Sequence, residues 1–231
     1  MASAQDDAKR AAARAALAEL PERGIIGIGT GSTAHAFIAA LAELAGARER
    51  YRAVATSEAS RAFAASLGIA LLDDDGPWAI AVTVDGADEV DDNLQLVKGG
   101  GGAHAREKIV NASSRRNVIV VDESKRSRRL GERRAVPVEV LRFGHAATAA
   151  RLAALGTPAL RVADGAPFAT DAGNFIYDLA CGPIADPAAL DLALHAIPGV
   201  VETGLFIDRA DLVLIAGAAG VERLERRRPR A

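Results

Sequence analysis

The amino-acid sequence predicts an α/β protein built on a parallel β-sheet, with a second, smaller α/β domain inserted into the first. Two observations support this prediction. Short apolar runs alternate with stretches of helical spacing up to about residue 121, and glycine or proline separates many of them. Beyond residue 131 the order of the elements changes, and the apolar run at residues 212–215 then adds one more buried strand to the first domain.

The first part of the chain alternates strands with helices. The alanine-rich segment 8–20 has helical spacing and is ended by Pro21 and Gly24, after which an apolar strand begins. The further expected elements are strand 25–28, helix 33–45, strand 53–55, helix 58–67, strands 69–72 and 79–84, a helix from the glycines at 99–102 to residue 113, and strand 118–121. This alternation is typical of a parallel sheet whose two faces are covered by helices.

The segment between residues 131 and 206 has a different order of elements. Its expected strands are 136–141, 159–162, 174–179 and 200–206, and its expected helices are 145–155 and 187–195. The order β-α-β-β-α-β is that of the ferredoxin-like arrangement. We therefore predict a larger domain of residues 1–130 plus 207–231 and a small domain of residues 131–206, with the arginine-rich Glu222–Ala231 as a solvated end.

Composition and charge argue against several classes of protein. Half of the 231 residues are hydrophobic, which is enough for a core, and the net charge of −2 gives no sign of nucleic-acid or membrane binding. The uncharged stretch Gly24–Ala42 is interrupted by glycines and hydroxyl residues, so we expect a turn there and no membrane span. The single cysteine, Cys181, cannot form an internal disulfide, which predicts a reducing compartment and hence the cytoplasm.

Lysine is scarce in this chain. Only four of the 28 basic residues are lysines, namely Lys9, Lys98, Lys108 and Lys125. A compact ammonium and a planar guanidinium are not interchangeable at a tight site, so each lysine is a candidate functional residue. A chance distribution is the alternative.

The first glycine-rich segment, Gly27–Thr33, lies between a predicted strand and a predicted helix. Its glycines let the backbone approach an anion, and the helix N-terminus offers free N–H groups beside the hydroxyls of Ser32 and Thr33. The segment is therefore a candidate phosphate site. An ordinary tight turn with a helix cap is the alternative.

An acidic segment, Asp85–Asp91, directly follows the apolar strand at 79–84. Ligands of open α/β sheets bind at the carboxyl ends of the strands, so Asp85 and Asp88 are expected near such a site. They could act as acid and base or hold sugar hydroxyls, and the lack of a nearby histidine or cysteine argues against a metal. A solvated acidic turn is the alternative.

Four consecutive glycines follow Lys98. Such a run is entropically costly and is expected where the backbone must pass close to something else. Lys98 supplies a positive charge beside the loop, and Glu107 lies on the helix that follows. A surface carboxylate that pairs with an arginine is the alternative interpretation of Glu107.

Lys125 stands just after the strand at 118–121, again at the carboxyl end of a strand. This position suits a phosphate ligand, and a surface lysine is the alternative. The four histidines, at positions 35, 104, 145 and 195, show no metal-ligand spacing. We expect neither a metal nor an organic cofactor.

Taken together, these segments resemble ribose-5-phosphate isomerase of the A type. The motifs that match, in the family's order, are Gly29-Thr-Gly-Ser-Thr33, Thr56-Ser-Glu-Ala-Ser60, Val84-Asp-Gly-Ala-Asp-Glu89, Lys98-Gly-Gly-Gly101, Arg106-Glu-Lys108, Ser124-Lys125, Pro137-Val-Glu-Val140, Thr170-Asp-Ala-Gly-Asn174, Ile197-Pro-Gly-Val200 and Gly204-Leu-Phe206. They span nearly the whole chain, so the resemblance is far more specific than one glycine motif. Two positions depart from the pattern, since alanine is common at Gly102 and an apolar residue at His104.

The resemblance implies a Rossmann-like first domain, a homodimer or homotetramer, and a place in the non-oxidative pentose phosphate pathway. It implies that D-ribose 5-phosphate and D-ribulose 5-phosphate are interconverted through an enediolate, with Glu107 as the base and with Asp85, Asp88 and Lys98 as further catalytic residues. The implied substrate-binding residues are Lys9, Thr30, Gly31, Ser32, Thr33, Asp85, Gly86, Ala87, Asp88, Lys98, Gly99, Gly100, Gly101 and Lys125.

Two other classes of protein fit parts of the pattern. A sugar-phosphate sensor would need the phosphate loop but not Glu107, Asp85 and Lys98 together, and the roughly twenty residues before the first strand are too few for a helix-turn-helix. A coenzyme A transferase-like enzyme would use a glutamate as a covalent nucleophile and would bind a coenzyme A thioester.

Overall fold

The structure, a computed structural model, describes residues 4–226. The chain forms two compact units. The first consists of the residues up to Ala87, Arg106–Lys125 and the residues from Arg209 on, and the second consists of Asp88–Ala105 and Arg126–Asp208. The predicted domains, 1–130 plus 207–231 and 131–206, differ from these units mainly in where they assign residues 88–105. That division into domains stays a prediction.

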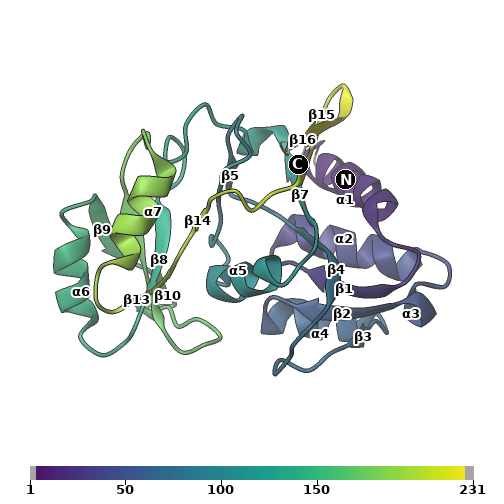
Figure 1. Cartoon of the computed structure of the whole chain (residues 1–231), viewed down its shortest axis with the longest axis horizontal. Helices are drawn as coiled ribbons and strands as arrows, with labels where there is room; N and C mark the ends of the chain where they lie inside the picture. The colour runs from purple at the N-terminus through teal and green to yellow at the C-terminus, as the bar shows by residue number, and fades with distance from the viewer. Residues whose placement is uncertain (1–3, 227–231) are drawn as a thin grey trace, which may run out of the picture. The chain divides into compact units, whose positions relative to one another are not determined.

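The first unit is built on a seven-stranded sheet in the order β16-β15-β7-β4-β1-β2-β3 (Figure 1). Its strands are β1 (Gly24–Ile28), β2 (Tyr51–Ala55), β3 (Ala70–Leu71), β4 (Ile80–Asp85), β7 (Asn117–Asp122), β15 (Leu212–Gly217) and β16 (Gly220–Glu225). All neighbouring strands are parallel except β15 and β16. The chain builds outward from β1 through β2 to β3, then returns to β4 beside β1, which is the Rossmann-like order with its switch point at β1 and β4.

Helices cover both faces of this sheet. They are α1 (Ala4–Ala16), α2 (Ser32–Glu43), α3 (Ala47–Arg50), α4 (Glu58–Ser66) and α5 (His104–Ala112), with short 3-10 turns at Leu17–Glu19 and Glu123–Lys125. α1 and α2 lie side by side (Figure 1), and Phe37 and Ile38 of α2 pack in one buried cluster with Ile26 and Ile28 of β1. Val110 of α5 packs on the opposite face in a separate cluster. Full burial of each such side chain contributes roughly 1.5–3 kcal/mol.

The second unit contains a four-stranded antiparallel sheet in the order β13-β8-β12-β9. Its strands are β8 (Val136–Val140), β9 (Thr157–Leu160), β12 (Phe175–Ala180) and β13 (Val200–Thr203), its helices are α6 (His145–Leu152) and α7 (Pro187–His195), and β10 (Val162–Ala163) and β11 (Ala166–Pro167) form a small hairpin. The order of these main elements is the predicted β-α-β-β-α-β arrangement, with Leu152 and Leu194 of the two helices buried in its core.

A small three-stranded sheet brings residues 88–105 into the second unit. It consists of β5 (Glu89–Val90), β6 (Leu96–Val97) and β14 (Leu205–Phe206), in the order β14-β6-β5. We predicted one strand over 200–206, but the structure has two strands in different sheets, separated at Gly204. A Cβ atom at Gly204 would lie 2.3 Å from the carbonyl oxygen of Lys98, so the crossing between the two sheets requires glycine there.

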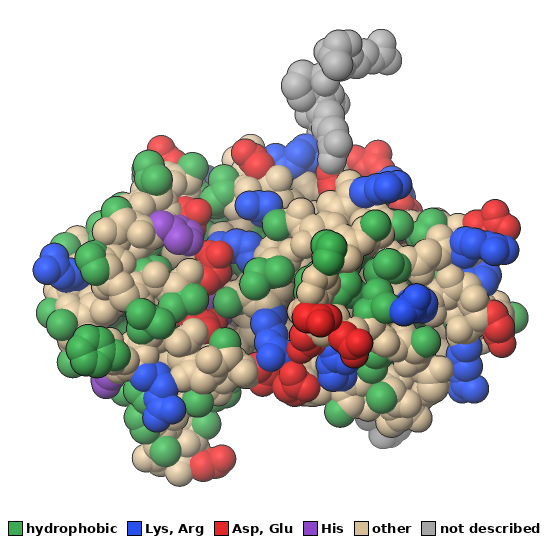
Figure 2. Space-filling model, turned by 60° about the horizontal axis from the view of Figure 1, so that its bottom comes forward, with side chains coloured by type: hydrophobic (Ala, Val, Ile, Leu, Met, Phe, Trp, Pro, Cys, Tyr) green, Lys and Arg blue, Asp and Glu red, His purple; other side chains and the backbone are tan. Residues whose placement is uncertain are grey.

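The prediction for the C-terminal segment was wrong for the residues that the structure describes. Glu222–Glu225 are part of β16, which pairs antiparallel with β15 through a turn at Gly217–Gly220. The rest of the predicted solvated end, residues 227–231, lies outside the described residues. Among the helices of residues 4–226, none is long and apolar enough to cross a membrane. Figure 2 shows acidic and basic side chains interspersed over one face of the molecule.

Candidate active site

The switch point of the large sheet brings Gly29 and Asp85 into contact. Gly29 follows β1 and donates its N–H to the carbonyl of Val84 in β4 at 3.0 Å. A Cβ atom at Gly29 would lie 1.9 Å from the Oδ1 atom of Asp85 and 2.7 Å from its Cα atom. Only glycine lets the carboxylate occupy this place, at the edge where ligands of doubly wound sheets bind.

The Asp85 carboxylate is held by main-chain N–H groups. Its Oδ1 atom accepts hydrogen bonds from the amide of Thr30 at 3.1 Å and from the amide of Gly86 at 2.7 Å. The side chain is only 3% exposed. Hydrogen bonds to an ionised acceptor are stronger than neutral ones, so these contacts fix both the loop after β1 and the carboxylate at the end of β4.

A cluster of hydroxyl groups lies behind Thr30. The Thr30 hydroxyl is 2.7 Å from that of Thr56 and donates to Ser57 Oγ at 2.8 Å. The Ser60 hydroxyl donates to the carbonyl of Gly29 at 2.7 Å, and all three partners are buried. We did not predict Thr56, Ser57 and Ser60 as site residues, although the motif at 56–60 could have indicated them because it follows β2, next to β1 in the sheet.

The N-terminus of α2 lies directly after this loop. Gly31 has a φ of +97°, and Ser32 and Thr33 are the first two residues of the 12-residue helix. Gly31 and Ser32 are exposed, so the N–H groups of the first turn face a solvent-accessible position. Lys9 of α1 lines the same open pocket as Ser32. A helix N-terminus and an ammonium group together favour an anion.

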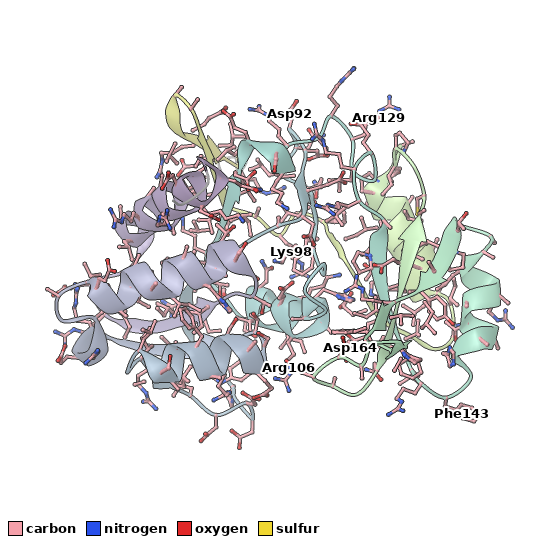
Figure 3. The ribbon with its side chains drawn as sticks, turned by 180° about the vertical axis from the view of Figure 1, so that it is seen from behind. Asp92, Lys98, Arg106, Arg129, Phe143 and Asp164 are labelled. Carbon is pink, nitrogen blue, oxygen red and sulfur yellow. The ribbon has the colours of Figure 1, made fainter. Side chains whose placement is uncertain are left out.

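Glu107 lies in the first turn of α5, and Val110 of the same helix packs on the sheet. Its side chain is 4% exposed, and the neighbouring Lys108 is 9% exposed. Gly27 of β1 permits this close packing, because a Cβ atom there would lie 2.8 Å from Val110 Cγ1. The alternative interpretation, a surface carboxylate, therefore does not hold for Glu107. Arg106 (Figure 3) instead pairs with Glu58 of α4 at 2.8 Å.

The carboxyl end of β7 carries Asp122 and Lys125. Asp122 accepts hydrogen bonds from Ser124 and from the side chain of Gln5 in α1, and Lys125 is half-buried. Burial would raise the pKa of Asp122, but the hydrogen bonds from Ser124 and Gln5 and the charge of Lys125 outweigh it and hold the pKa below 3.8. We did not predict Asp122 as a site residue, and its carboxylate interacts electrostatically with the Lys125 ammonium.

In the second unit, Asp88 binds the glycine loop that follows β6. Its Oδ2 atom accepts a hydrogen bond from the amide of Gly100 at 2.7 Å. Its own amide donates to the carbonyl of Val97 at 2.8 Å. The chain therefore places Asp88 and Gly100 in direct contact, 12 residues apart in sequence. Ala87 and Gly86, which precede Asp88, are half-buried and belong to the first unit.

Lys98 (Figure 3) directly follows β6 and is 3% exposed. Its amide donates to the carbonyl of Gly204 at 2.8 Å. Its Nζ atom lies 5.4 Å from the centroid of the Phe206 ring, which is a favourable distance for a cation–π interaction. Lys98 is thus held through its main chain beside the small three-stranded sheet and through its ammonium by the Phe206 ring.

The glycines of the loop are required by its neighbours. Gly99 has a φ of +104° and a Cβ atom there would lie 2.7 Å from His104 Nδ1. Gly102 has a φ of +79° and a Cβ atom there would lie 2.4 Å from Phe168 Cε1. The exposed Gly100 and Gly101 lie between these two. The extra glycine of this chain, Gly102, therefore leaves the space that the Phe168 ring occupies.

The geometry defines a class of protein. Each unit carries an aspartate that holds a glycine-containing loop through its main-chain N–H groups, Asp85 in the first and Asp88 in the second. The first unit adds a buried glutamate and a helix N-terminus beside a lysine, and the second adds a buried lysine. This is a doubly wound α/β protein with the groups that acid–base chemistry on a small anionic substrate needs.

Comparison with known proteins gives the family. Residues 52–220 match the family model described as ribose 5-phosphate isomerase A (phosphoriboisomerase A). Ribose-5-phosphate isomerase A of Caulobacter vibrioides (strain NA1000 / CB15N) is 47% identical over 227 residues, which cover 95% of this chain and 98% of the relative. The chain belongs to the ribose 5-phosphate isomerase A family.

Solved structures agree with this assignment. Ribose 5-phosphate isomerase A from Methanocaldococcus jannaschii superimposes with a TM-score of 0.90 at 36% identity, covering 96% of this chain and 100% of that one. A D-ribose-5-phosphate isomerase in complex with phospho-erythronic acid gives 0.91 at 37% identity, covering 97% of this chain and 100% of that one. The predicted fold class, a Rossmann-like parallel-sheet domain with a small ferredoxin-like α/β domain, is confirmed.

Proposed function

We infer that this chain is a ribose-5-phosphate isomerase that interconverts D-ribose 5-phosphate and D-ribulose 5-phosphate. Its membership of the isomerase family over nearly its whole length carries this inference. The reaction moves a proton between C1 and C2 of the open-chain sugar through an enediolate. It needs a base, stabilisation of the enediolate oxygens, proton transfer between these oxygens, and an anchor for the phosphate.

Glu107 is the proposed base. One carboxylate can take a proton from one carbon and return it to the next, since both carbons lie within reach of a single side chain. The burial of Glu107 on a regular helix supports this role, because a catalytic group on a rigid element is held more precisely than one on a loop. Lys98, equally buried, is the proposed cation that stabilises the enediolate oxygens, and the amides of Gly99, Gly100 and Gly101 assist it.

Asp85 and Asp88 are the proposed groups for ring opening and for proton transfer between the two oxygens. Their positions support this, since two main-chain N–H groups orient the Asp85 carboxylate and one orients that of Asp88. Gly86 and Ala87, which connect them, are proposed to contact the substrate through the main chain.

The phosphate is proposed to bind at the N-terminus of α2. Gly31, Ser32 and Thr33 supply main-chain N–H groups there, Ser32 and Thr33 add hydroxyls, and Lys9 lines the same pocket as Ser32. Thr30, whose amide and hydroxyl donate to Asp85 and Ser57, is proposed to border the same site. Lys125, at the carboxyl end of β7, is proposed as a second cation for the phosphate. Remote binding energy of this kind fixes the reacting carbons in place.

The test is a direct assay of the purified protein. Ribose 5-phosphate is supplied together with a chelator, and ribulose 5-phosphate is followed by its absorbance. Turnover is expected, and Glu107→Gln is expected to lower kcat by roughly 10²–10⁴ because it removes the base. The matched control is Glu139→Gln, which removes a buried carboxylate in the second unit while its Oε1 can still accept from Thr170 and Asn174.

The outcomes separate the assignments. Loss of kcat in Glu107→Gln with near-normal kcat in Glu139→Gln supports the base. A loss smaller than about tenfold in a folded Glu107→Gln protein contradicts it while leaving the activity intact. No turnover by folded native protein, with ribose 5-phosphate still raising its melting temperature, contradicts the isomerase and favours a sugar-phosphate sensor.

A homodimer or a homotetramer is the assembly that we propose, with the cytoplasm as its compartment. The assembly follows from the family resemblance, and the compartment from the single cysteine, Cys181, which cannot form an internal disulfide. Sedimentation velocity distinguishes the two assemblies, and a monomer at micromolar concentration would contradict both.

A further inference from the structure

The peptide group between Gly99 and Gly100 is held at both of its ends. Its N–H, which belongs to Gly100, donates to Asp88 Oδ2 at 2.7 Å. Its carbonyl, which belongs to Gly99, accepts from Arg161 Nη1 at 2.8 Å and also from the amide of Gly102 at 2.9 Å. One peptide group thus connects a guanidinium on one side with a carboxylate on the other.

Arg161 is itself fixed. Its Nε atom donates to Asp178 Oδ2 at 3.0 Å and its Nη2 atom donates to Asp178 Oδ1, which makes a two-point contact with the carboxylate in β12. The Arg161 side chain is 16% exposed, and its Cζ atom lies 5.9 Å from the centroid of the Phe168 ring. The same Nη1 atom reaches the carbonyl of Gly100 at 3.3 Å.

These contacts form a continuous line of charges and dipoles within the second unit. It runs from the Asp178 carboxylate through the Arg161 guanidinium and the Gly99–Gly100 peptide to the Asp88 carboxylate. A cation on the carbonyl of a peptide polarises it and strengthens the hydrogen bond that its N–H donates. Asp88, Gly100, Arg161 and Asp178 also line one pocket.

We propose that Arg161, anchored by Asp178, is a positioning residue that acts on Asp88 through the Gly99–Gly100 peptide. The proposal rests on the proposed function, since it takes Asp88 to transfer protons during the isomerisation. Arg161 fixes the peptide whose N–H orients the Asp88 carboxylate, and it fixes the loop that begins at Lys98.

Arginine suits this position better than lysine. Its planar guanidinium reaches a carboxylate with two N–H groups while a third points at the carbonyl of Gly99. An ammonium group on a flexible stem cannot hold both partners in one geometry. Arg161→Lys is therefore expected to recover only part of the effect of arginine.

The experiment measures kcat and KM for ribose 5-phosphate with the native protein and with Arg161→Met. A lost hydrogen bond from a charged group predicts a kcat about 10- to 100-fold lower. KM is expected to stay within about threefold of the native value. The residues proposed to bind the phosphate, which stabilise the bound substrate and the transition state alike, are unchanged in this variant. The control is Arg134→Met, which removes the same charge from the same pocket and is expected to leave kcat and KM unchanged.

The coupling to Asp88 is measured in a double-mutant cycle. If Arg161 acts through Asp88, Arg161→Met lowers the residual kcat of Asp88→Asn by less than about threefold. Equal losses in the native and the Asp88→Asn backgrounds overturn the proposal, as does a native kcat in a folded Arg161→Met protein. A native protein without turnover would contradict the proposed function instead.

Should Arg161→Met fail to fold, the same cycle is run with Asp178→Asn. This variant leaves the guanidinium in place and removes only its anchor, so it is expected to lower kcat by a smaller factor that again disappears in the Asp88→Asn background. A factor that persists in that background overturns the proposal.

Discussion

Two glycine-containing loops carry candidate substrate-binding groups, and they are built in different ways. The loop Gly29–Thr33 is held by neutral hydroxyls and by the buried Asp85 carboxylate, and it leads into a helix of 12 residues. The loop Lys98–Gly102 is held through its carbonyls by Arg161 and through one N–H by Asp88. The first is supported mostly by groups without charge, and the second by an ion-paired cation.

The glycines of the two loops also meet different neighbours. At Gly29 the missing side chain makes room for a carboxylate that is itself held by two amides. At Gly102 it makes room for the ring of Phe168, which rotates about single bonds. A glycine in a sequence indicates that space is needed, and only the structure shows whether the neighbour can give way.

The largest effect is expected for Gly29→Ala. The new Cβ atom would lie 1.9 Å from Asp85 Oδ1, and neither the carboxylate nor the Cα atom behind it can move without breaking the bonds to Thr30 and Gly86. We expect kcat/KM to fall by at least about 100-fold, since a displacement of 1 Å can cost that much. Steady-state kinetics and thermal melting measure it.

The matched substitution for stability is Gly86→Ala, where a Cβ atom would meet nothing closer than 3.8 Å. Its melting temperature is expected to stay close to the native value while that of Gly29→Ala falls. Equal melting temperatures for the two variants would contradict the close contact at Gly29.

A smaller effect is expected for Gly102→Ala. The Cβ atom would lie 2.4 Å from Phe168 Cε1, but the ring can move, and the φ of +79° adds about 1–2 kcal/mol of strain. We expect a loss of stability of about 2–4 kcal/mol, measured by urea unfolding, when both costs apply. In a Phe168→Ala background the cost of Gly102→Ala is expected to fall to the part caused by backbone strain, since the clash is absent there. An equal cost of Gly102→Ala in the native and Phe168→Ala backgrounds would show that the ring is not the obstacle.

Thr30→Val is expected to have a still smaller effect. The substitution keeps the shape but removes the hydroxyl that lies against Thr56 and Ser57, at a cost of about 1–2 kcal/mol in the free energy of unfolding. Thr30→Ser keeps the hydroxyl and serves as the control. If the two variants unfold at the same urea concentration, the hydroxyl cluster does not stabilise the first loop.

The smallest effect concerns pH and involves His35 of α2, the helix that follows the first loop. Burial lowers the pKa of His35 below 6.5, and the ring lies 4.8 Å from that of Phe63 and 3.4 Å from Ser60 Oγ. The unfolded chain therefore binds a proton more readily, so this contribution to stability is complete above about pH 6.5 and decreases as the pH falls toward the folded pKa.

Urea unfolding between pH 7.5 and 5 measures this contribution of His35. The native protein is expected to lose more stability over this range than His35→Gln, which cannot take up the proton. An identical slope in both proteins would mean that His35 titrates alike in the folded and unfolded chains.

The sequence predicted six of the seven strands of the large sheet, all except β16, because each of the six contains or adjoins a continuous apolar run. It did not predict β5 and β6, and it did not separate β14 from β13, since strands of two residues outside a longer apolar run leave too short a pattern to recognise. It also missed β16, because Val221 and Leu224 are separated by two charged residues and lack the alternation of a strand, so the segment resembles a solvated tail when its partner strand is unknown.

The residues of the candidate site could be predicted where each belongs to a short motif that is continuous in the sequence. Asp85, Asp88, Lys98 and Glu107 stand out by residue type and by position after a strand or a glycine run. Arg161 did not, because it is one arginine among many and its partners are 62 residues away in the chain at Gly99 and 17 at Asp178. Sequence reasoning identifies groups that could react more easily than the groups that hold them.

The hairpin formed by β15 and β16 has a consequence for the behaviour of this chain at high concentration. An open sheet ends in strands whose unpaired N–H and C=O groups can recruit other molecules. Here one edge strand, β3, has only two residues, and the other, β16, is mostly exposed and carries charged side chains such as Arg223, which pairs with Glu19. Without β16, the fully apolar run Leu212–Ala216 would itself be an open edge, so the hairpin protects the sheet from edge-to-edge aggregation.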